Sequence, residues 1–81
     1  MNQDKRMKLN EIIARNLKAW MLVRGIRQTE LAQSVGVSQS TIARLTKGQV
    51  NCSAVAIGKV CEKLEIDVSD LVYDKRKKRA S

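Results

Sequence analysis

Apolar residues recur every three or four positions along most of this 81-residue chain, which is the spacing of one face of an α-helix. The first such run predicts a helix over about Glu11–Arg24, with Asn10 as its N-cap and Gly25 as its C-terminal stop. A shorter run predicts a second helix over Gln28–Val35. Gly36 would end this helix, because glycine adopts a positive φ at little cost.

Two further helices are predicted from the same spacing. The third covers about Gln39–Lys47, with Ser38 as its N-cap and Gly48 as its stop. The fourth begins after the N-cap Ser53 and carries an apolar stripe on one face. This stripe consists of Ala54, Ile57, Val60, Cys61 and Leu64.

A short fifth helix is predicted through Leu71 and Val72. Asp67 is followed three residues later by Asp70, and this pair resembles an acidic capping box at a helix start. With 43% hydrophobic residues but few aromatic ones, the chain suits a compact bundle of short helices. The sequence therefore predicts an all-α, five-helix fold.

The length of the chain allows one domain, because so short a chain cannot bury a second core. Residues 1–8 are polar without an apolar period and predict a flexible N-terminal arm. Residues 9–74 form the predicted domain, and residues 75–81 form a basic tail that is expected to be disordered.

Charge is unevenly distributed along the chain, whose formal net charge is +8. Up to Gly48, nine Lys or Arg residues oppose three acidic ones, whereas two oppose five over Gln49–Asp74. The run Lys75–Arg79 adds five more positive charges. This pattern predicts one basic surface and favours a polyanionic partner.

The cysteines and the hydropathy of the chain exclude several other properties. Cys52 and Cys61 are not closely paired and the chain has no His, so no metal site is expected. No apolar run approaches the roughly 18 residues needed to span a bilayer, and no signal-peptide pattern follows the N-terminus. A reducing cytoplasmic location is therefore expected.

The segment QTELAQSVGVSQSTIARL places two short helices around the turn Gly36–Ser38, which is the spacing of a helix-turn-helix. Ala32 is small enough for the second of these helices to cross close over the first, and Gly36 opens the turn. The expected buried positions are Leu31, Val35, Val37, Ile42 and Leu45.

With this motif, the chain resembles the Cro/repressor (XRE-type) family of phage and bacterial transcriptional regulators, and the lambdoid repressors in particular. The likeness covers about Ile13–Leu71, and ARNLKAWMLVRGIRQTELAQSVGVSQSTIARLTKG is similar to the first three helices of that family. The resemblance implies a sequence-specific DNA-binding regulator, a repressor, that binds a near-palindromic operator as a homodimer. Its third helix would enter the major groove.

The resemblance places the base-reading residues at Gln39, Ser40 and Arg44. The side-chain chemistry agrees, because Gln pairs with adenine, Arg pairs with guanine, and Ser bonds several base edges. Without the surrounding motif, these three positions would be an ordinary solvated helix face.

The phosphate contacts and the dimer interface are also expected from the resemblance. The family uses a Gln at the position of Gln28 to hold a phosphate and to brace the first base-reading residue. The expected phosphate-contacting residues are Gln28, Arg27, Ser38, Thr41, Lys47 and Asn51. The expected dimer interface, in the region of the fourth and fifth helices, consists of Val68, Val72 and Tyr73.

The sequence departs from the family pattern at a few positions. Arg27 stands where a Ser or Thr usually caps the second helix, which weakens that cap. Glu65 replaces a common glycine after the fourth helix, and Cys52 replaces a common proline. Leu22 and Val23 occupy positions that are usually polar, and they predict an apolar patch beside the core residue Trp20.

Other classes of function are alternatives to DNA binding. An enzyme is not expected, because the chain lacks His, a metal cluster and a phosphate-cradling loop, and is too small for a closed pocket. No cofactor or small-molecule substrate is indicated. An antitoxin that binds a toxin and represses its own operon stays open as an alternative, as does a controller protein of a restriction-modification system. Neighbouring genes would distinguish these.

Overall fold

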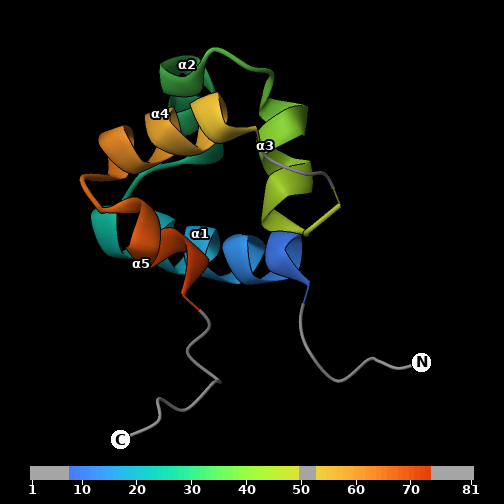
Figure 1. The fold of residues 1–81 in the computed structure, drawn as a ribbon. Helices are drawn as coiled ribbons and strands as arrows, with labels where there is room; N and C mark the ends of the chain where they lie inside the picture. The colour runs from blue at the N-terminus through green and yellow to red at the C-terminus, as the bar shows by residue number, and fades with distance from the viewer. Residues whose placement is uncertain (1–7, 50–52, 74–81) are drawn as a thin grey trace, which may run out of the picture.

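The computed structural model describes residues 8–49 and 53–73, and this part of the chain folds into five α-helices (Figure 1). They are α1 (Leu9–Arg24), α2 (Gln28–Val35), α3 (Gln39–Thr46), α4 (Ala54–Leu64) and α5 (Val68–Val72). The described ranges contain no strand, so the predicted all-α fold is confirmed. Within the same ranges, no helix is both long and apolar enough to cross a membrane.

Several predictions fall outside the described residues. They concern most of the N-terminal arm (residues 1–7), the positions Asn51 and Cys52, and the basic tail over residues 75–81. The proposed roles of these segments stay predictions from the sequence.

Most helix ends lie where the capping residues predict. The Ser38 hydroxyl accepts a hydrogen bond from the Thr41 amide (3.2 Å), and the Ser53 hydroxyl accepts one from the Ala56 amide (3.1 Å). The Asp67 amide donates to the Asp70 carboxylate (3.1 Å), as the acidic capping box requires. These bonds satisfy amides that a helix leaves unpaired at its start.

The predicted start of the first helix is wrong. α1 begins at Leu9, and Lys8 occupies the N-cap position, where its amide donates to the Glu11 carboxylate (3.0 Å). The Asn10 side chain instead donates to the carbonyl of Gly48, which follows α3. Asn10 is a suitable cap by residue type, but this tertiary bond to a residue 38 positions away uses its amide.

The core lies between the helices and takes residues from all five. Its buried apolar residues are Ile13, Ala14, Leu17, Met21, Leu31, Ala32, Val35, Ile42, Leu45, Val60, Cys61, Leu64 and Leu71. Trp20 is half-buried against this core, as predicted. Ala54 is exposed, against prediction, because it is the first residue of α4 and lies beyond the buried part of the stripe.

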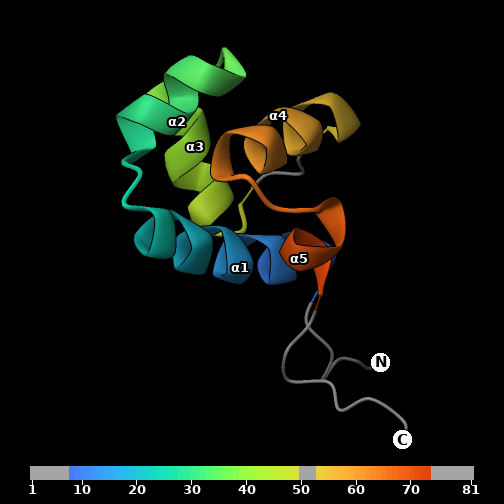
Figure 2. The ribbon, with the colours of Figure 1, turned by 90° about the vertical axis from the view of Figure 1, so that its left-hand side faces the viewer.

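The arrangement of the helices leaves α3 at an edge of the molecule. Figure 1 and Figure 2 show α1 and α5 on one side, α2 and α4 on the opposite side, and α3 spanning between them. α3 packs on α2 and on α1, and α5 packs mainly on α1. One face of α3 is thus held by the core while the other faces outward.

Candidate nucleic-acid interface

The turn between α2 and α3 has the geometry that the motif predicts. Gly36 ends α2 with a φ of 85°, and the amides of Gly36 and Val37 both donate to the carbonyl of Ala32, at 2.8 and 3.0 Å. Ala32 itself is only 4% exposed and belongs to the core cluster, and α2 packs on α3. Close packing at this point fixes the direction in which α3 leaves the turn.

The buried side of α3 holds the helix in place. Ile42 is completely buried and Leu45 nearly so, and both belong to the central core cluster. Thr46 is also buried, and its hydroxyl donates to the carbonyl of Ala43 (2.7 Å). The opposite side of α3 is therefore presented to solvent on a rigid support.

The three predicted base-reading residues lie on this exposed side, which we call the contact face (Gln39, Ser40 and Arg44). All three are exposed. Ser40 and Arg44 are four positions apart, so they lie one above the other along the helix, and Gln39 stands at its first turn. Within the described residues, the Gln39 and Arg44 side chains make no hydrogen bond or ion pair, so their donors are available to a ligand.

Hydroxyl groups gather at the start of α3. The Ser38 hydroxyl lies 2.9 Å from that of Thr41 and 3.1 Å from that of Ser40. Ser38 thus acts first as the N-cap of the helix, while it remains exposed. The phosphate contacts of Ser38 and Thr41 stay predictions.

The other predicted phosphate-contacting residues occupy two helix ends. Arg27 is the exposed N-cap of α2 and makes no side-chain capping bond, which agrees with the weak cap that its residue type predicts. Gln28 follows as the first residue of α2 and is half-buried, and Lys47 is the exposed C-cap of α3. Helix N-termini attract anions, so the start of α2 suits a phosphate.

The predicted dimer residues lie on α5 and at its end. Val68 is 49% exposed and Tyr73 is 42% exposed, whereas Val72 is half-buried. The neighbouring Leu71 is buried and anchors α5 to the core. α5 therefore presents apolar surface to solvent at the positions that the resemblance indicates.

Asn16 is a residue whose importance was not predicted. It is 2% exposed, and its side-chain amide donates to the carbonyls of Leu71 (2.7 Å) and Tyr73 (2.6 Å). These bonds tie the end of α5 to the middle of α1. The available signal was one polar residue among the apolar positions of α1, but its partners lie more than fifty residues away.

The end of α4 is held by a cation from α1. The Arg24 guanidinium donates to the carbonyls of Leu64 (2.8 Å) and Glu65 (3.2 Å) and lies over the Trp20 ring, 5.2 Å from its centroid. Glu65, which stands where relatives have glycine, adopts a φ of 59° in the left-handed region. α4 is also joined to α2 by an ion pair between Lys63 and Glu30 (3.4 Å).

Leu22 and Val23 are strongly exposed on the outer side of α1, at 84% and 68%, which confirms the predicted apolar patch. Among the residues that the structure describes, no group of three or more His, Cys, Asp or Glu side chains is placed to hold a metal ion.

Comparison with known protein families identifies the class of this molecule. The sequence model of the Cro/C1-type HTH DNA-binding domain matches residues 16–77, a stretch that includes the whole of α2, the turn and α3. The chain belongs to this family. The Cro/C1-type protein is thus a DNA-binding transcriptional regulator and not an enzyme.

Solved structures of other regulators are similar to this Cro/C1-type protein. The clp gene regulator ClgR from Corynebacterium glutamicum superimposes with a TM-score of 0.78 at 26% identity, over 80% of this chain and 69% of that one. The restriction-modification controller protein C.AhdI from Aeromonas hydrophila gives 0.72 at 27% identity, over 76% and 94%.

A third similar structure is that of the SOS-response transcriptional repressor LexA from Eubacterium rectale, with a TM-score of 0.80 at 26% identity over 96% of this chain and 83% of that one. No curated protein sequence matches the chain.

Proposed function

We propose that this Cro/C1-type protein is a transcriptional repressor that binds a near-palindromic operator as a homodimer, with α3 of each subunit in the major groove. The observation that carries the proposal is the contact face of α3. Its three side chains are exposed and polar, and the opposite side of the same helix is buried in the core. A rigid helix with an exposed polar face is what direct readout of base edges requires.

Each side chain of the contact face has a distinct role. Gln39 offers a carboxamide that pairs with adenine, and Arg44 offers a guanidinium that pairs with the two acceptors of guanine. Ser40 accepts from or donates to several base edges. Each good bidentate pair contributes about 1–3 kcal/mol of discrimination against the wrong base.

The phosphate contacts fix the orientation of α3 and carry no sequence information. Arg27 and Gln28 at the start of α2 and Lys47 at the end of α3 flank the contact face along the chain. Ser38, Thr41 and Asn51 complete the proposed set. Binding should therefore weaken with salt in proportion to the number of neutralised phosphates.

The dimer follows from the size of the reading element. One short helix reads few base pairs, and specific affinity generally needs two half-sites about 34 Å apart. The exposed apolar side chains of Val68 and Tyr73 and the half-buried side chain of Val72 support a self-complementary contact through α5.

Selection of bound duplexes from random DNA, followed by affinity measurements on every single-base variant, tests the contact face. Gln39→Ala and Arg44→Ala should each cost about 1–3 kcal/mol, with the loss concentrated at one base pair per half-site. Gln33→Ala on α2 and Lys59→Ala on α4 are matched controls, because both residues are exposed and lie outside the proposed contacts. Unaltered base preferences in both α3 variants would refute the assignment.

Two measurements test the finer parts of the proposal. Footprinting of the selected operator should reveal two symmetry-related half-sites, and one asymmetric half-site occupied by a monomer would overturn the dimer. Transcription in vitro from a promoter that overlaps the operator should fall as the protein is added. An increase in transcript would indicate that the protein is an activator and not a repressor.

A further inference from the structure

The C-terminal end of α3 is fastened to the first turn of α1 by a hydrogen bond outside the contact face. The side-chain amide of Asn10 donates to the carbonyl of Gly48, two residues past the end of α3. Figure 1 shows this end of α3 next to the start of α1, and the two helices pack on each other. Asn10 is half-buried, so water competes less for the bond than it would at an exposed site.

Gly48 also lies close to the backbone of α1. It adopts a φ of 72° in the left-handed region. A Cβ atom added to Gly48 would lie 3.5 Å from the Cα of Glu11 and 3.6 Å from the carbonyl oxygen of Asn10, which are van der Waals distances. The turn that ends α3 therefore lies against the first turn of α1 as well as accepting a hydrogen bond from it.

The same turn includes the backbone of Arg44. The carbonyl of Arg44 accepts from the amide of Gln49 (3.0 Å), and this bond encloses Gly48 in the turn. A left-handed residue in this place closes the last turn of a helix. Arg44 thus belongs to the hydrogen-bonded turn that Asn10 holds, whereas Gln39 lies at the opposite end of α3.

The apolar anchor of this helix end does not fix its orientation by itself. Leu45 is buried in the core, but the burial of apolar surface is non-directional. A hydrogen bond requires the donor to point at the acceptor, so it constrains rotation as well as distance. The core therefore determines how deeply the end of α3 is seated, and the bond from Asn10 determines its orientation.

We propose that Asn10 is a positioning residue for base reading: it holds the carbonyl of Gly48 and so fixes the orientation in which the last turn of α3 presents Arg44 to the operator. This inference rests on the proposed function, and Asn10 acts through Arg44 without a DNA contact of its own. A guanidinium pairs with guanine through two donors that must meet two acceptors together. A small rotation of the turn should therefore weaken the discrimination at the base pair that Arg44 reads.

Two variants remove the donor from residue 10. Asn10→Ala removes the polar side chain, and Asn10→Asp keeps its shape but replaces the donor with an acceptor. Asp in the first turn of α1 suits the positive end of the helix dipole, so Asn10→Asp should keep the start of α1 intact. Arg44→Ala and Gln39→Ala, each tested on every single-base variant of the selected operator, identify the base pair that each residue reads.

The readout is the ratio of the affinity for the selected duplex to the affinity for a duplex changed at one base pair. A lower folded fraction affects both affinities alike, so a purely structural role of Asn10 leaves this ratio unchanged. One hydrogen bond can bias an orientation by no more than its own net free energy, which corresponds to about fivefold. Both Asn10 variants should reduce the discrimination at the Arg44 base pair by about fivefold and keep the wild-type discrimination at the Gln39 base pair.

In an Arg44→Ala background, Asn10→Ala should not alter the base preferences further, because its effect passes through the guanidinium. Wild-type discrimination at the Arg44 base pair in either Asn10 variant would overturn the inference and leave the proposed function standing. An equal loss at the Gln39 base pair would also overturn it, because Asn10 would then act on the whole of α3. If Arg44→Ala and Gln39→Ala leave every base preference unchanged, the proposed function fails and the inference fails with it.

Discussion

Replacing Glu65 with glycine should stabilise this protein. Glu65 ends α4 with a φ of 59° and a ψ of 47°, the left-handed conformation in which a Cβ atom crowds the following carbonyl. Its amide donates to the carbonyl of Glu62 (3.2 Å) and its carbonyl accepts from Arg24 (3.2 Å). Both bonds belong to the backbone of residue 65 and are kept when the side chain is removed.

The magnitude follows from two opposing effects. Removing the Cβ relieves about 1–2 kcal/mol of left-handed strain. Glycine also makes the unfolded chain more flexible, which costs about 0.4–1 kcal/mol. The net gain in the free energy of unfolding should be about 0.5–1 kcal/mol. For a domain of this size, a change of 1 kcal/mol shifts the melting temperature by roughly 4–8 °C.

Urea unfolding and thermal melts measure this gain, and Glu65→Ala is the control. The alanine variant loses the same negative charge from the C-terminal end of α4 but keeps the Cβ, so it reports the effect of the helix dipole alone. Glu62→Gly is a second control: it lies inside α4, where glycine should destabilise by about 1 kcal/mol. A Glu65→Gly protein no more stable than Glu65→Ala would refute the argument from backbone strain.

Three further predictions concern the packing of the helices and the tail. Ala32→Leu should force α2 and α3 apart and cost about 1–3 kcal/mol in urea unfolding; a variant of unchanged stability would contradict the close crossing. Asn16→Leu should leave the carbonyls of Leu71 and Tyr73 without their donor, which should lower the free energy of unfolding by about 1–3 kcal/mol for each carbonyl. The larger apolar side chain of leucine should offset part of this loss. Unaltered thermal unfolding would show that these bonds contribute nothing. Deleting Lys75–Ser81 should weaken binding to all DNA sequences alike and flatten its salt dependence, because the run neutralises phosphates without reading bases. An unchanged salt slope would mean that the tail only solubilises the chain.

The part of the candidate site that depends on the spacing of nearby residues could be predicted from the sequence. The spacing of Ile42 and Leu45 determines which side of α3 is buried, and so leaves Gln39, Ser40 and Arg44 on the exposed side, as the structure confirms. Their roles in reading bases stay predictions. The left-handed end of α4 was also foreseeable in part, because the family pattern has a glycine where this chain has Glu65.

The sequence by itself determined the order of the five helices, the helix-turn-helix and most of the helix ends. These features depend on residues within a few positions of one another, such as the Ser38 hydroxyl and the amide of Thr41, or the positive φ of Gly36. Such short-range rules are the same in every fold, so the pattern of residue types is sufficient to apply them.

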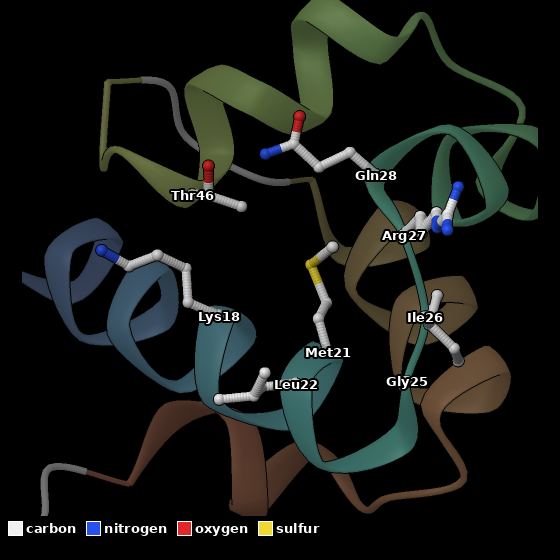
Figure 3. A pocket seen from close by; sticks show the side chains of 8 residues that line it. All are labelled: Lys18, Met21, Leu22, Gly25, Ile26, Arg27, Gln28 and Thr46. Atoms are coloured by element: carbon white, nitrogen blue, oxygen red, sulfur yellow. The ribbon is translucent and has the colours of Figure 1, made fainter.

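Only the tertiary structure decided which polar groups join distant segments. Asn10 donates to Gly48, Asn16 to the end of α5 and Arg24 to the end of α4, across 38 to 57 positions of the chain. A pocket lined by residues of α1, α2 and α3, Lys18 and Thr46 among them (Figure 3), likewise exists only where these three helices meet. A side-chain amide or guanidinium can bond any carbonyl that comes within reach, so its residue type does not specify the partner. The packing of the core brings that partner close, and the packing depends on all five helices together.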